Sequence, residues 1–186
     1  ILVVASNLLS FWLSSRASSI SLRTLVAPPC PEIKSMIINL IIIALSIIGM
    51  ETFAIFFHKY FMHGPGWKWH ESHHTHTEGY FERNDLYALC FSVIAAVLFI
   101  LGSLYFEPLY FIALGFTIYG LLYGFVHDGL VHRRWPFKYA PKNGYLYRLV
   151  LAHRIHHNTT TKKGAVSFGF LYAERISKLK SKLKDQ

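Results

Sequence analysis

The run MIINLIIIALSIIGMETFAIFF, residues 36–57, decides the fold, because Glu51 is its one charged residue. An α-helix needs about 20 apolar residues to cross the roughly 30 Å hydrocarbon layer of a membrane. Two further runs of this kind follow at residues 86–106 and 109–126. Backbone groups in lipid must form their hydrogen bonds within the segment, so we expect three transmembrane helices.

The composition of the 186-residue chain agrees with a membrane protein. Hydrophobic residues make up 53% and charged residues 16%, whereas about a quarter of the residues of soluble domains are charged. Two cysteines are too few for a disulfide framework. We predict an all-α integral membrane protein with an N-terminal extension of unknown role (1–35), one membrane domain (36–173) and a basic amphipathic tail (174–186). The apolar stripe of the tail is expected to lie on the membrane surface.

Lysine and arginine are spread unevenly along this chain of net charge +9. Only Glu107 and Pro108 separate the second and third runs, so these runs form a tight helical hairpin. Segments 58–85 and 132–186, at the far ends of the hairpin, hold 16 of the 19 basic residues. The positive-inside rule places this side in the cytoplasm, which would be beneath the inner membrane in a bacterium. Topology and anionic lipid explain the charge, so no nucleic-acid partner is expected.

Ten of the 11 histidines form four groups, in which the pattern HX4H followed by HX2HH occurs twice. All ten lie on the predicted cytoplasmic side, in a helical cap. His76 belongs to no group and is expected to be an exposed loop residue. The candidate metal ligands are His58, His63, His70, His73, His74, His127, His132, His153, His156 and His157.

The spacing of these histidines predicts how they converge. The three histidines of HX2HH, at positions i, i+3 and i+4, lie on one face of a helix. The adjacent His73 and His74 point in directions about 100° apart, so we expect them to serve different metals or a shared centre. The two histidines of HX4H are about 140° apart on an ideal α-helix. We therefore expect each helix to end or distort there, at Gly64-Pro65-Gly66 and at Asp128-Gly129. Imidazole suits iron, zinc, copper and nickel, and ten imidazoles favour two ions.

Nearby acids are candidates to accept the second ring N–H of each ligand. Asp128, next to His127, is the best candidate, and Asp85 and Glu71 are weaker ones. Glu51 lies seven residues before His58, on nearly the same helical face and about 10 Å deeper in the membrane. It either orders the site or bonds to a neighbouring helix, and both interpretations stay open.

Other metal proteins explain less of the pattern. The sequence HESHH at 70–74 also fits HExxH, the helix of zinc proteases, but an intramembrane zinc metalloprotease would leave eight clustered histidines unused. A ferritin-like site needs more Glu-x-x-His motifs than the single one at Glu71. A transporter would place its ligands near the bilayer midplane. A non-enzymatic metal binder is a further alternative.

The repeated histidine pattern around a helical hairpin resembles the membrane fatty acid hydroxylase superfamily of non-haem di-iron oxygenases. Within it, four segments resemble the bacterial β-carotene 3-hydroxylases: GMETFAIFFHKYFMHG (49–64), FERNDLYA (81–88), YGLLYGFVHDGLVHRRWPF (119–137) and VSFGFLYA (166–173). HDGLVH together with the later VSFGF is the specific part. The resemblance covers about residues 36–173 and departs at His76-Thr77, where a basic or proline-containing stretch is expected.

The resemblance implies that the ten histidines bind two iron ions, for which zinc can substitute. It implies insertion of one oxygen atom of O2 at C3 of a β-ionone ring, which converts β-carotene to β-cryptoxanthin and then to zeaxanthin. A ferredoxin-type donor would supply two electrons. Another lipid hydroxylase or desaturase of the superfamily is the main alternative. The substrate is expected to enter from the bilayer between helices, beside the candidate lining residues Phe56, Phe57, Tyr119, Tyr123 and Phe125.

Overall fold

The computed structural model describes residues 33–75, 79, 81–136 and 139–185, and these residues form helices and connecting loops without strands. His76 and nearly all of the predicted N-terminal extension lie outside this part of the chain. The last three residues assigned to the extension begin the first helix instead.

Three helices are long and apolar enough to cross a membrane: Ile33–Met62, Asp85–Leu104 and Pro108–Val131. The first consists of α2 (Ile33–Phe56) continued by η1 (Phe57–Met62), the second is α4 (Asp85–Leu104), and the third is α5 (Pro108–Tyr123) continued by η2 (Gly124–Val131). Leu40, Leu45 and other large apolar side chains on these helices are exposed, as expected for contact with lipid. The prediction of three membrane-spanning helices is confirmed.

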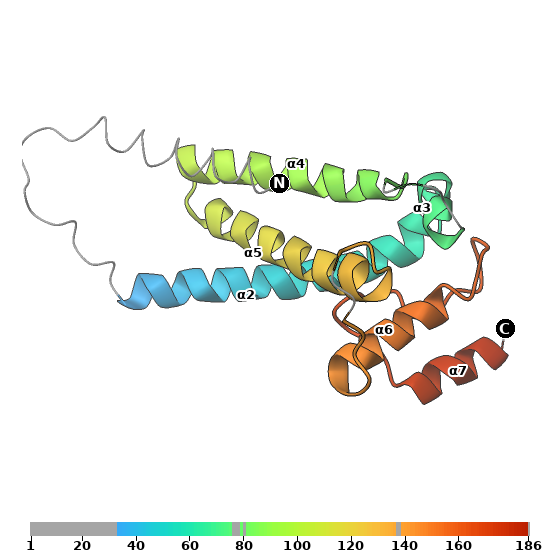
Figure 1. Ribbon diagram of the computed structural model, residues 1–186. Coiled ribbons are helices and arrows are strands. Elements are labelled where there is room, and N and C mark those ends of the chain that lie inside the picture. Colours follow the sequence, from blue (N-terminus) through green and yellow to red (C-terminus); the bar gives the residue numbers. More distant parts are fainter. Residues whose placement is uncertain (1–32, 76–78, 80, 137–138, 186) are drawn as a thin grey trace, which may run out of the picture.

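The three long helices run side by side, with α5 packed against both α2 and α4 (Figure 1). Small residues allow this close approach. A Cβ atom at Gly102 would lie 2.2 Å from the backbone nitrogen of Tyr110, so the hairpin of α4 and α5 has room only for glycine there. A Cβ atom at Gly115 would lie 2.5 Å from the Cβ of Ser46 on α2. These contacts fix the relative height of the helix ends that carry histidines.

Three shorter helices form the cap at one end of the long helices: α3 (Trp67–His74), α6 (Gly144–His156) and α7 (Ile176–Lys184) (Figure 1). Leu149, Ala152 and Val166 form the core of the cap, and Leu179 of α7 completes it with 1% of its surface exposed. Ile176 and Leu183 pack against the same core. The apolar stripe of the C-terminal tail therefore faces α6, and the expectation that it lies on the membrane surface is wrong.

Candidate metal centre

Two π-helical segments bring the HX4H histidines together. In a π-helix the N–H of residue i+5 bonds to the C=O of residue i, so residues five apart lie over one another. The N–H of His63 bonds to the carbonyl of His58 at 3.0 Å, and the N–H of His132 bonds to that of His127 at 2.9 Å. The expected distortion is present in both motifs, but it is a widened turn that begins before the glycines.

The HX2HH histidines lie on the buried faces of α3 and α6. His70, His73 and His74 are all buried on α3, and His153 and His156 are buried on α6, where His157 caps the C-terminal end. All ten predicted ligands meet between the ends of the long helices and the cap. Nine of them form two groups of converging ring nitrogens, and the nitrogens of each group lie within 4.8 Å of one another. The first group contains His58, His63, His70, His74 and His156, and the second contains His73, His127, His132 and His153.

His73 and His74 belong to different groups, which is one of the two arrangements that the sequence left open. His157 lies with the second group, since its Nε2 is 3.0 Å from Nε2 of His153. Its ring also stacks on His74 of the first group, with centroids 4.5 Å apart. His157 thus lies between the two groups.

The hydrogen bonds of the rings fix which nitrogen carries the proton. Seven histidines donate Nδ1–H to an oxygen, so in the neutral ring Nε2 keeps a bare lone pair. These bare nitrogens point at each other: Nε2 of His58 lies 2.9 Å from Nε2 of His70, and Nε2 of His73 lies 2.8 Å from Nε2 of His127. Neither member of such a pair can donate a proton to the other. The seven rings are His58, His63, His70, His73, His74, His127 and His156.

Lone pairs that face each other at this distance repel unless a cation lies among them. Metal–imidazole bonds are about 2.0–2.1 Å long, so adjacent ligands of one ion have their nitrogens about 3 Å apart. The donor set therefore fits one cation in each group. Imidazole ligands suit iron and zinc.

Burial keeps the histidines neutral, as metal ligands must be. Loss of hydration lowers the pKa of His70 to about 2, that of His157 to about 3 and that of His74 to about 4. The same cause, reinforced by repulsion between neighbouring imidazoles, holds the pKa values of His153 and His156 well below the usual 6.5.

We expect the cap of the metal-free protein to lose stability as the pH falls below about 6.5. In the unfolded cap, His70, His74 and His157 take up protons near this pH, whereas in the folded cap they stay neutral. The unfolded state then binds more protons, so the free energy of unfolding keeps decreasing as the pH falls. The share of His74 levels off near pH 4, where it also titrates in the fold, whereas His157 and His70 contribute down to lower pH. Hydrogen exchange of α6 between pH 7.5 and 4.5 in detergent would measure this. Exchange independent of pH after correction for the intrinsic rate would contradict it, and His74→Gln should reduce the slope.

Of the three acids predicted to accept a ring N–H near the cluster, only Asp128 does so. Asp128 accepts the Nδ1–H of His127 at 2.8 Å, as expected of the best candidate. Asp85 instead pairs with both terminal nitrogens of Arg134, at 2.8 and 2.6 Å. Glu71 is exposed on α3, while its histidine neighbours are buried. This position also gives no support to the protease interpretation, which needs Glu71 at the metal.

Two residues that the sequence analysis missed hold the rings of α3. Glu82 accepts the Nδ1–H of His73 and Asn84 accepts that of His70, each at 2.8 Å. Both belong to the FERND stretch before α4, which carries part of the family resemblance and was the available signal. Backbone carbonyls accept the Nδ1–H of four further rings: those of Thr159, Lys162, Val166 and Phe168 bond to His74, His63, His156 and His58.

Glu51 anchors the loop that supplies two of these carbonyls. Its Oε1 accepts the backbone N–H groups of Phe170, Leu171 and Tyr172 at 2.8–3.0 Å. Its Oε2 accepts the hydroxyl of Tyr119 on α5 at 2.9 Å. Glu51 therefore does both things that the sequence left open, because it bonds to a neighbouring helix and orders the loop beside the histidines.

Aromatic side chains close the cluster on one side. Tyr123 stacks on His127 with centroids 4.6 Å apart, and Phe170 contacts rings of both groups, His58 at 5.2 Å and His127 at 5.4 Å. Phe170 was not among the predicted lining residues.

The other four predicted lining residues have partners outside the histidine cluster. Phe57 stacks on Phe61, Phe56 is 56% exposed, Phe125 lies near Trp135, and Tyr119 bonds to Glu51.

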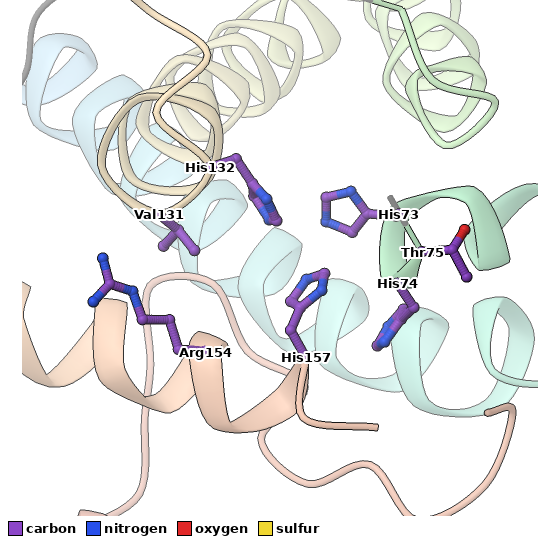
Figure 2. Close-up of a pocket in the computed structure, with 7 residues that line it drawn as sticks. All are labelled: His73, His74, Thr75, Val131, His132, Arg154 and His157. Carbon is purple, nitrogen blue, oxygen red and sulfur yellow. The ribbon is translucent and has the colours of Figure 1, made fainter. Parts of the chain in front are cut away.

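A cavity of about 310 Å³ opens beside the second group (Figure 2). The rings of His73, His132 and His157 point toward one another, and His74 and Arg154 lie to either side of them. The residues that line it are His73, His74, Thr75, Val131, His132, Arg154 and His157.

Comparison with known proteins identifies the family. Residues 43–176, which include all ten clustered histidines, match the fatty acid hydroxylase family. The chain belongs to this family. Family members similar to it include a beta-carotene hydroxylase of Pantoea ananas, 54% identical over 80% of this chain and 85% of the relative. A beta-carotene hydroxylase of Pseudescherichia vulneris is 51% identical over 81% of this chain and 86% of the relative.

Plant relatives are more distant. A chloroplastic beta-carotene 3-hydroxylase of Arabidopsis thaliana is 40% identical over 73% of this chain and 46% of its own length. No solved structure matches the chain. These matches confirm the resemblance to the fatty acid hydroxylase family and, within it, to the bacterial beta-carotene hydroxylases.

Proposed function

We propose that this protein is a carotenoid hydroxylase that inserts one oxygen atom of O2 at C3 of a β-ionone ring, converting β-carotene to β-cryptoxanthin and then to zeaxanthin. The observation that carries the proposal is the pair of buried groups of bare imidazole nitrogens at the ends of membrane-spanning helices. Identity of 54% to a beta-carotene hydroxylase supports the choice of substrate.

The chemistry requires a redox metal, because the C–H bond to be hydroxylated carries no acidic proton for a base to remove. We assign one iron ion to the first group and one to the second, with His157 between them. Iron bound there would activate O2 with two electrons and two protons, so that one oxygen atom enters the C–H bond and the other leaves as water.

The chain itself positions the substrate and limits access of water. An apolar carotenoid dissolved in the bilayer meets the long helices along their exposed apolar faces and reaches the histidines at the helix ends. Tyr123 and Phe170 form an aromatic wall against the histidine rings. Apolar contact with this wall would orient a ring, and the orientation decides which C–H bond reacts.

The cavity beside the second group is too small for a whole carotenoid, and we assign it to O2 and water. It opens next to Arg154 on the cap side. The excess of lysine and arginine in segments 58–85 and 132–186 supports a cytoplasmic position for the cap. A soluble ferredoxin-type donor would reach the metals from that side.

Expression in a bacterial host that accumulates β-carotene tests the function directly. We expect chromatography of the extracted pigments to show β-cryptoxanthin and zeaxanthin in place of part of the β-carotene. His127→Ala, expressed to the same level, is the control and should leave β-carotene unchanged. Unchanged β-carotene with the wild-type protein, in membranes that contain the protein, iron and a reductase, would overturn the proposal. A product hydroxylated at another carbon would overturn the assignment of the ring position alone.

A further inference from the structure

The two histidine groups differ in what holds their outer ring nitrogens. All five rings of the first group donate Nδ1–H to neutral oxygens, namely four backbone carbonyls and the side-chain amide of Asn84. In the second group, the two Nδ1 donors with a described partner both bond to carboxylates. These are Glu82 on His73 and Asp128 on His127, each at 2.8 Å.

Further charge surrounds the second group. Asp85 accepts the backbone N–H of Glu82 at 3.0 Å, and Arg134 lies between Asp85 and Asp128, at 2.6 and 3.7 Å. The four side chains of Glu82, Asp85, Asp128 and Arg134, three carboxylates and one guanidinium, together carry a net negative charge. Within the described residues, the hydrogen bonds to the first group come from uncharged oxygens.

We infer that the protein builds two unequal metal positions, in which Glu82 and Asp128 make the second group the more strongly donating one. A carboxylate that accepts Nδ1–H draws the proton toward itself and raises the electron density at Nε2, which makes the ring a stronger ligand. A carbonyl does so far less, because it carries no full charge. The inference deepens the proposed function, since it concerns the same two metal positions.

One short segment produces much of this difference. Glu82 and Asn84 are two residues apart in the loop before α4, and they hold His73 and His70, which belong to different groups. Asn84 is buried, with 5% of its surface exposed, so its amide has little contact with solvent. Aspartate has the same shape as asparagine, and glutamine the same shape as glutamate. The charge can therefore be moved from one group to the other while the hydrogen bonds are kept.

The inference predicts a stepwise titration with Co²⁺ for the full-length protein in detergent after removal of bound metal. The wild type should bind two ions, with one step at least about 10-fold tighter than the other. Glu82→Gln should loosen the tight step by about 10- to 100-fold and leave the weak step unchanged. Asn84→Asp should tighten the weak step, so that the two steps converge.

The outcomes separate the inference from the proposed function. Fewer than two bound ions in the wild type would refute the two-metal centre, whereas two ions bound in one equivalent step would refute only the inequality. Glu82→Ala shows whether the charge is the cause, because alanine removes both the charge and the hydrogen bond. If Glu82→Gln binds Co²⁺ like the wild type while Glu82→Ala does not, Glu82 only orients His73 and the inference is wrong. Thermal melting of each variant shows whether the fold is kept.

Discussion

His156→Ala is expected to abolish formation of hydroxylated pigment and to remove metal from the first group. His156 has no exposed surface, and its Nε2 lies 3.1 Å from Nε2 of His74 and 3.2 Å from Nε2 of His63. Its Nδ1–H also bonds to the carbonyl of Val166 in the loop that follows α6, so the ring joins the cluster to that loop. Alanine would remove one of the five proposed ligands of the first group together with this bond to the loop.

The measurement is iron per protein after purification, together with pigments from the host that accumulates β-carotene. We expect iron content to fall by about half or more and zeaxanthin to be undetectable. His76→Ala is the control, because the sequence places His76 outside the four groups, and it should keep most of the activity. An equal loss with His76→Ala would show that the ligand set is wrong, and so would full iron content in His156→Ala.

Glu51→Ala is expected to release the loop at 166–172 and to reduce metal binding strongly, although Glu51 is not a ligand. Its carboxylate accepts one hydroxyl and three backbone N–H groups. A buried donor left without an acceptor costs about 1–3 kcal/mol, so losing several at once is enough to free the loop. The carbonyls of Val166 and Phe168, which hold His156 and His58, would then no longer be fixed.

Two milder variants each remove only part of the hydrogen bonding of Glu51 and should have smaller effects on metal binding. Tyr119→Phe removes only the bond to Oε2 and should leave metal content near that of the wild type. Glu51→Gln keeps one oxygen for the backbone N–H groups and should be intermediate. Hydrogen exchange at residues 166–173 and metal content would both be measured. If Glu51→Ala keeps the exchange protection of the loop and its full metal content, the anchoring role is refuted.

Features that depend on local pattern were predictable from the sequence. The long apolar runs gave the three spanning helices, and the i, i+3 and i+4 spacing gave the buried faces of α3 and α6. The distortion between His58 and His63 followed from a spacing that an α-helix cannot use for chelation. Its form, a π-helix, did not follow, because several irregular turns satisfy the same spacing.

Features that depend on contacts distant in sequence were not predictable. Glu71 adjoins His70 in sequence but lies on the exposed face of α3, whereas Glu82 reaches His73 from a separate loop. Backbone carbonyls give no signal at all, because every residue has one. The stripe of α7 was ambiguous, since an apolar helix face suits lipid and protein equally, and only the packing of Leu179 against α6 decides between them.

The oxygens that hold the first group have a consequence for biogenesis. Four of them belong to Thr159, Lys162, Val166 and Phe168, all beyond α6, although four of the five histidines of this group precede α4. The ribosome has thus delivered all three spans to the membrane before the chain can close around a cation. Metal capture must be a late maturation step, and a nascent chain that stops before residue 168 would insert normally yet stay empty.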